Sequence, residues 1–195
     1  MKKFFALVSA ALLAACSSNP PVTITKDAEY NPATQARVRL YGQNRHKMLA
    51  WHDIDCTSPR QSRGFKVDVS VRSTLRAAFE ADKNESIGIP ETEISRNTGT
   101  SQNGLLNTGF FKEITVSAGL PMNVQSSMAS NDGRYRRYCK TKIVSFVPKA
   151  GKDYEITGVD GKDKKWCSLA VFEIAQDGTT TPVELNARAV CSKRR

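Results

Sequence analysis

The chain is poor in the residues and motifs that mark common enzymes. It has only two histidines among 195 residues, and it contains no G-x-S-x-G, H-E-x-x-H, P-loop or dinucleotide-binding motif. No apolar run reaches the roughly 20 residues that a membrane-spanning helix needs. The chain has no internal repeat and no long low-complexity block. From these absences we predict a protein without catalytic residues, cofactor or metal.

The first sixteen residues have the pattern of a bacterial export signal. Lys2 and Lys3 precede an apolar stretch, residues 4–12, which is followed by Leu13-Ala14-Ala15-Cys16. A charged start, a short apolar core and small residues before the cleavage point are the parts of a signal peptide. The run LAAC, followed by Ser17-Ser18-Asn19, resembles the bacterial lipobox. The resemblance implies cleavage before Cys16, acylation of Cys16 and, because serine follows it, location at the outer membrane.

Composition along the chain predicts three parts. Residues 1–15 are the signal peptide, residues 16–35 a flexible tether carrying the lipid anchor, and residues 36–195 a single β-sandwich domain. Pro20 and Pro21 lie in the tether, where their missing backbone donors disfavour helix and strand interiors. Removal of the signal leaves 180 residues, a length that one domain accommodates.

The chain carries an excess of positive charge. It has 29 basic and 19 acidic residues, a net charge of +10, which falls to +8 when the signal peptide is removed. Such a balance favours anionic partners. For an exported protein we expect these to be lipid headgroups, lipopolysaccharide, acidic glycans or another envelope protein, and not nucleic acid. The membrane itself is the partner of the acyl chains on Cys16, and the domain lies in the periplasm or at the cell surface.

Four cysteines remain beyond the lipid anchor: Cys56, Cys139, Cys167 and Cys191. An even number of cysteines in an oxidising compartment predicts two disulfides, and the three possible pairings stay open. Their spacings of 83, 28 and 24 residues do not match the close spacing of thiolate metal ligands. Each disulfide would contribute about 2–4 kcal/mol to stability.

Alternation of apolar and polar residues predicts many short strands. It is clearest in residues 36–42, 47–54 and 65–71, where it is typical of strands with one buried face. In the last of these, Phe65, Val67, Val69 and Val71 fall on one face. Further strands are predicted at residues 110–116, 122–125, 141–147, 153–156, 166–174 and 183–185.

The middle of the chain is less regular. Residues 73–81 match a short helix that Ser73 caps. Residues 84–108 are rich in Asn, Thr, Ser and Gly and predict a long surface loop. The predicted fold is therefore mainly β, an antiparallel β-sandwich of about 7–9 strands with one short helix and a long middle loop.

Four stretches resemble a family of small proteobacterial lipoproteins. They are residues 84–92, 112–121, 146–156 and 167–174. The family is largely uncharacterised and has one immunoglobulin- or transthyretin-like β-sandwich, and the resemblance covers most of residues 36–191. It implies the sandwich fold and a location in the envelope, and it brings no catalytic or binding residues.

The strongest candidate for a binding surface is a basic run with interleaved tyrosines, residues 134–142. Arginine matches the geometry of phosphate and carboxylate, and tyrosine stacks on rings and sugars. A charged hairpin flank that serves only solubility is the alternative. The candidate anion- or partner-binding residues are Arg134, Tyr135, Arg136, Arg137, Lys140 and Lys142.

His52-Asp53-Ile54-Asp55 is the only stretch that suggests a hydrolytic dyad or a metal-binding loop. On a continuous strand His52 and Asp53 would face opposite sides, so we do not expect them to meet. We therefore predict an outer-membrane lipoprotein with a noncatalytic sandwich that binds an envelope component or a protein. An accessory subunit of a secretion, pilus or adhesion system is the alternative, followed by an envelope hydrolase that uses His52.

Overall fold

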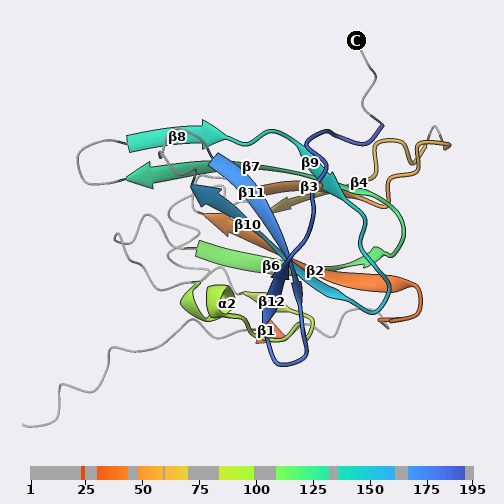
Figure 1. Ribbon diagram of the computed structural model, residues 1–195, viewed down its shortest axis with the longest axis horizontal. Helices are drawn as coiled ribbons and strands as arrows, with labels where there is room; N and C mark the ends of the chain where they lie inside the picture. Colours follow the sequence, from red (N-terminus) through yellow and green to blue (C-terminus); the bar gives the residue numbers. More distant parts are fainter. Residues whose placement is uncertain are drawn as a thin grey trace, which may run out of the picture.

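The computed structural model describes residues 23–24, 30–43, 48–58, 60–69, 84–98, 109–131, 136–160 and 167–191. Their strands form two sheets that pack face to face (Figure 1). The larger sheet contains, in spatial order, β1 (Thr23–Ile24), β5 (Glu85–Ser86), β6 (Gly109–Ser117), β2 (Gln35–Gln43), β10 (Asp153–Asp160), β11 (Cys167–Ile174) and β12 (Thr180–Pro182). The smaller sheet contains β4 (Phe65–Val69), β3 (Met48–His52), β7 (Met122–Asn131) and β8 (Arg136–Lys140), with β9 (Val144–Phe146) also paired to β7.

The predicted fold class is confirmed. The described residues are mainly strand, form a β-sandwich and include one short helix, α2 (Glu93–Asn97). Most described strand pairs are antiparallel, but β2 pairs with β10 in parallel, as do β1 with β5 and β5 with β6. The strands β2 and β10 are far apart in the sequence, so no hairpin sets their relative direction.

The hydrophobic core lies between the two sheets. On β2, every second residue points inward, and Ala36, Val38 and Leu40 are completely buried. Matching positions of the neighbouring strands continue this layer, because side chains alternate between the two faces of a sheet. The smaller sheet closes the core with Met48, Ala50, Val69, Met122, Val124 and Phe146.

The prediction of a surface loop at residues 84–108 is wrong for its described part, residues 84–98. This part contains β5 and α2, and Asn84, Ser86, Ile89, Thr92 and Ser95 are buried. Thr92 caps α2 through its hydroxyl, which accepts a hydrogen bond from the Ser95 amide. Ser86 and Thr92 donate hydrogen bonds to buried carboxylates, and Asn84 accepts one from the Phe111 amide. Composition does not reveal these partners. The helix predicted at residues 73–81 lies outside the described residues.

Several predicted boundaries also change. The predicted tether overlaps the folded domain, because Thr23–Ile24 pairs with β5 and Gln35 begins β2. Cys16 and the predicted signal peptide lie outside the described residues. Phe65, predicted on a buried face, is 58% exposed because it begins a strand at the end of its sheet. The last strand is β12, not residues 183–185; Val183 and Leu185 instead pack against the core as irregular backbone.

Candidate functional site

The basic run predicted as a binding surface borders the smaller sheet. Arg136 and Arg137 lie in β8, opposite Asn131 and Ser130 of β7. The exposed Lys140 ends β8, and the exposed Lys142 follows it. The other two residues of the run, Arg134 and Tyr135, lie outside the described residues. The structure therefore places four of the six candidates at one edge of the sandwich.

A second group of charges, not predicted from the sequence, lies on the outer face of the larger sheet. Arg39 of β2 is opposite Glu113 of β6 on one side and Glu155 of β10 on the other. Arg39 Nη2 lies 2.7 Å from Glu113 Oε1, and Arg39 Nη1 lies 3.7 Å from Glu155 Oε2. These three residues are at most 4% exposed. We call them, together with Tyr41 and Thr92, the buried cluster.

The buried cluster holds residues 84–98, which we call the covering segment, against the sheet. Glu113 Oε2 accepts hydrogen bonds from Ser86 Oγ at 2.9 Å and from the Ile87 amide at 2.7 Å. Arg39 Nη2 donates to the carbonyl oxygens of Ile89 and Pro90, both at 3.0 Å. Hydrogen bonds to charged groups are stronger than neutral ones, so these contacts fix an otherwise irregular backbone.

Glu155 completes the buried cluster. Its Oε2 accepts hydrogen bonds from Tyr41 Oη at 2.9 Å and from Thr92 Oγ1 at 2.7 Å. Burial, reinforced by the Glu155 carboxylate and opposed by Arg39, raises the pKa of Tyr41, which keeps this hydroxyl a hydrogen-bond donor. Arg39 Nη1 and Glu155 Oε1 are buried without a hydrogen bond. Because its charged groups are buried, the cluster supports the fold and presents no surface to a dissolved ligand.

A sequence signal for the buried cluster exists, although the prediction missed it. Arg37 and Arg39 alternate with apolar residues on β2, and Asp153 and Glu155 alternate in the same way on β10. Arg37 meets Asp153 through two hydrogen bonds of 2.7 and 2.6 Å. Opposite charges at matching positions of two strands indicate neighbouring strands. The alternation in residues 36–42 predicted one buried face, but the charged face of this strand is buried as well.

The expectation that His52 and Asp53 lie on opposite faces is wrong. The strand β3 ends at His52, and Asp53 has a positive φ of 54°, so the alternation stops there. Asp53 Oδ2 lies 3.2 Å from His52 Nδ1, a contact without hydrogen-bond geometry. Asp53 Oδ1 accepts a 2.7 Å hydrogen bond from the Ser117 amide. The His52 imidazole packs against Phe65 of β4, and Asp53 binds the end of β6. The two residues therefore connect the smaller sheet with the larger one.

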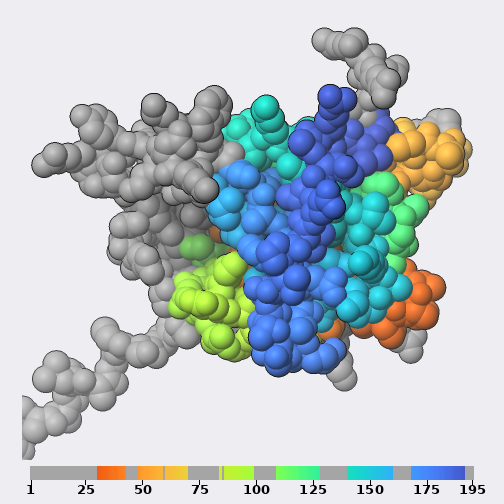
Figure 2. Space-filling view, in the orientation of Figure 1, coloured from red at the N-terminus to blue at the C-terminus, as the bar shows by residue number. Residues whose placement is uncertain are grey.

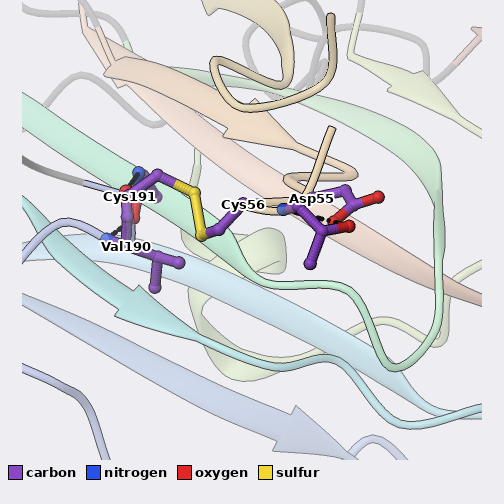
Figure 3. The surroundings of a disulfide bond; sticks show 6 residues. Asp55, Cys56, Val190 and Cys191 are labelled. Carbon is purple, nitrogen blue, oxygen red and sulfur yellow. Dashed lines mark hydrogen bonds between the residues drawn. A yellow bond between two sulfur atoms is a disulfide. The ribbon is translucent and has the colours of Figure 1, made fainter. Parts of the chain in front are cut away.

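One predicted disulfide is present, and its pairing is resolved. Cys56 is bonded to Cys191, 135 residues later (Figure 3). Of the other two cysteines, Cys139 lies in β8 and Cys167 in β11. Their side chains lie outside the described part of the structure, so the second predicted disulfide stays a prediction.

The disulfide fastens residues 183–191, which we call the C-terminal segment. The Val183 amide donates to Val171 of β11, and Asn186 forms a β-bridge with Ser145 of β9. Asn123 of β7 binds both backbone groups of Val190, at 2.9 and 3.2 Å. The segment therefore links the two sheets along one side of the sandwich.

Among the described residues, no three His, Cys, Asp or Glu side chains gather in an arrangement that would hold a metal ion. That part of the chain also has no helix with the length and apolar character needed to cross a bilayer. Comparisons with protein-family models, with curated proteins and with solved structures found no match to this chain.

Proposed function

We propose that the mature protein is a lipoprotein of the outer membrane, anchored through acyl chains on Cys16. Its β-sandwich is noncatalytic and binds an envelope component or a protein partner. The observation that carries the proposal is the lipobox-like LAAC run at residues 13–16, placed ahead of a folded sandwich. More than one acyl chain makes membrane attachment effectively stable, so the sandwich acts as a fixed platform.

Two further features support this proposal. The Cys56–Cys191 disulfide is of the kind that persists in oxidising compartments such as the periplasm. Lys140 and Lys142 are exposed at the edge of the smaller sheet, where a basic surface attracts anionic or acidic partners.

Metabolic labelling with a fatty acid tests the anchor. We expect the full-length protein to incorporate label in bacterial cells and Cys16→Ala to incorporate none, because the thiol is the attachment point. Cys167→Ala is the matched control and should keep the label. An unlabelled wild-type protein, or a labelled Cys16→Ala variant, would show that the anchor is absent.

Retention of envelope components on the immobilised mature chain tests the binding role. We expect Lys140→Gln/Lys142→Gln to release a component that the wild type retains at low salt, because two cations leave the basic edge. Arg96→Gln/Arg188→Gln removes the same charge at exposed positions outside this edge and should retain the component. Failure of the wild type to retain anything at low salt would contradict the proposed binding function.

A further inference from the structure

One end of the sandwich is the end at which the chain enters β2, its first long strand. Strands β2, β4, β7 and β10 begin there, and β3, β6 and β9 end there. Backbone hydrogen bonds join the connecting segments, between Ala118 and Thr34, Gly119 and Pro148, Ile54 and Pro121, and Gly151 and Gln35. We call this end the entry rim: residues 30–35, 53–58, 60–66, 117–121 and 147–152.

The entry rim carries both of the large hydrophobic side chains that are exposed in the described part of the chain. Phe65, the first residue of β4, is 58% exposed, and Val147, directly after β9, is 48% exposed. Among the other side chains that the structure describes, the large apolar ones are buried or half-buried. Figure 2 shows the gold, green, cyan and orange segments of the rim together along one side of the molecule.

Exposed cations lie close in the sequence to both of these side chains. Arg60, Arg63 and Lys66 are exposed on either side of Phe65 in the sequence, and Lys149 is exposed two residues after Val147. The rim has two acidic residues, and each carboxylate accepts hydrogen bonds within the protein: Asp53 from Ser117, and Asp55 from Thr57. Lys152 pairs with Glu173 at 2.8 Å. The rim thus has a net positive charge.

The segment that carries Phe65 is held in place by covalent and backbone bonds. Cys56 is bonded to Cys191, and the Ser62 and Gly64 amides donate to Ser58 and Gln61. Gly64 has a φ of +66°, and a Cβ there would crowd the His52 carbonyl oxygen. A turn fixed in this way presents Phe65 without a large loss of conformational entropy when it binds.

We propose that the entry rim is a membrane-binding surface, with Phe65 and Val147 entering the interfacial layer and the four cations contacting anionic phospholipid headgroups. The inference builds on the proposed lipid anchor at Cys16. The seven residues from Cys16 to Thr23, where the chain first joins the larger sheet, span at most about 25 Å, so an anchored domain stays close to the bilayer. An acyl anchor combined with a basic patch is a recognised two-signal mode of attachment, and exposed aromatic residues add interfacial burial.

Vesicle flotation without the anchor tests the rim directly. The probe protein is the mature chain, residues 16–195, with Cys16→Ser, and it contains every residue that the structure describes. The vesicles contain phosphatidylethanolamine with phosphatidylglycerol, or phosphatidylcholine alone. We expect binding to the anionic vesicles only, because phosphatidylcholine offers no net charge to the cations.

Variants separate the rim from other basic surfaces. Arg60→Gln/Arg63→Gln should lower the partition coefficient about 30-fold, since each cation near an anionic surface contributes roughly one kcal/mol. Phe65→Ser, at an exposed position, should lower it about tenfold. Arg96→Gln/Arg188→Gln removes the same charge from exposed positions on α2 and the C-terminal segment, outside the rim and outside the basic edge, and should leave binding unchanged.

The outcomes distinguish this inference from the proposed function. Three results would overturn the rim as a membrane surface. They are an equal loss of vesicle binding in both double variants, no effect of Phe65→Ser on binding, and equal binding to neutral and anionic vesicles. Tight binding to soluble polyphosphate that ignores Phe65→Ser would also overturn it, in favour of a polyanion site. Fatty-acid labelling of Cys16 is measured separately from vesicle flotation. A protein that is not acylated and a rim that does not bind membranes therefore give different results.

Discussion

At the scale of single residues, Arg39 is the charge around which the outer face of the larger sheet is organised. It lies between two buried carboxylates and also binds two carbonyl oxygens of the covering segment. Removing charges from water costs several kcal/mol per ion, so such a group is stable only with its partners in place. The pair of Arg37 with Asp153, at a more exposed position, repeats the arrangement nearer the entry rim.

We predict that Arg39→Met destabilises the mature protein by about 3–5 kcal/mol, because it leaves Glu113 and Glu155 buried without a cation. Urea unfolding followed by circular dichroism measures this loss. Lys152→Met is the matched control: its ammonium contacts Glu173 at an exposed position, and we expect no measurable change. Equal unfolding midpoints for the two variants would refute the structural role of the buried cluster.

At the scale of elements, the covering segment is held from both sides. The buried cluster lies beneath it, and the turn between β11 and β12 contacts its Glu91 carbonyl oxygen. Gly178 in this turn has a φ of +81°, and a Cβ there would overlap that oxygen. Hydrogen bonds from the Thr179 amide and hydroxyl to Asp177 shape the turn and lower the pKa of Asp177. The absence of a side chain at Gly178 therefore permits the close approach.

We predict that Gly178→Ala destabilises the protein more than Gly119→Ala does. Both glycines have similar positive φ angles, 81° and 79°, but a Cβ at Gly119 meets nothing within 4 Å. Gly119→Ala should therefore cost about 1 kcal/mol for its backbone conformation alone. Gly178→Ala adds the clash with Glu91, and faster amide hydrogen exchange in the covering segment should accompany it. Equal losses of folding free energy at the two sites would mean that the turn between β11 and β12 does not secure the covering segment.

At the scale of the whole molecule, the Cys56–Cys191 disulfide joins the loop after β3 to the end of the described chain. It encloses most of the domain and fastens the C-terminal segment, whose Val183 and Leu185 pack against the core. It also fixes the segment that carries Phe65 on the entry rim. One covalent bond thus serves both the closure of the sandwich and the shape of its proposed membrane surface.

We predict that Cys56→Ser/Cys191→Ser destabilises the mature protein by about 2–5 kcal/mol, since the disulfide closes a long loop in the unfolded chain. Thermal or urea unfolding under non-reducing conditions measures the change. The double variant should also bind anionic vesicles more weakly than the wild type, because the Phe65 turn loses its anchor. Unchanged stability would contradict the role assigned to this bond.

Much of the sandwich was predictable from local patterns. Alternation located residues 36–42 and 110–116 because a half-buried strand needs an apolar residue at every second position. The alternation did not reveal that both faces of β2 are buried, because Arg39 looks like a solvated residue until Glu113 and Glu155 are beside it. The His52–Asp53 contact was missed for a similar reason: the positive φ that ends the alternation is absent from the residue pattern.

Residue types and short spacings are enough to indicate that the chain is mainly β, and the lipobox-like pattern at Cys16 is found in the sequence alone. Both are local properties, set by residue type and short spacing. Three features become visible only in the folded protein: Cys56 pairs with Cys191, residues 84–98 cover a sheet, and Phe65 shares a rim with Val147. These features depend on strand register and on contacts between residues far apart in the chain, where hydrogen bonding and burial select one arrangement among many that local patterns allow.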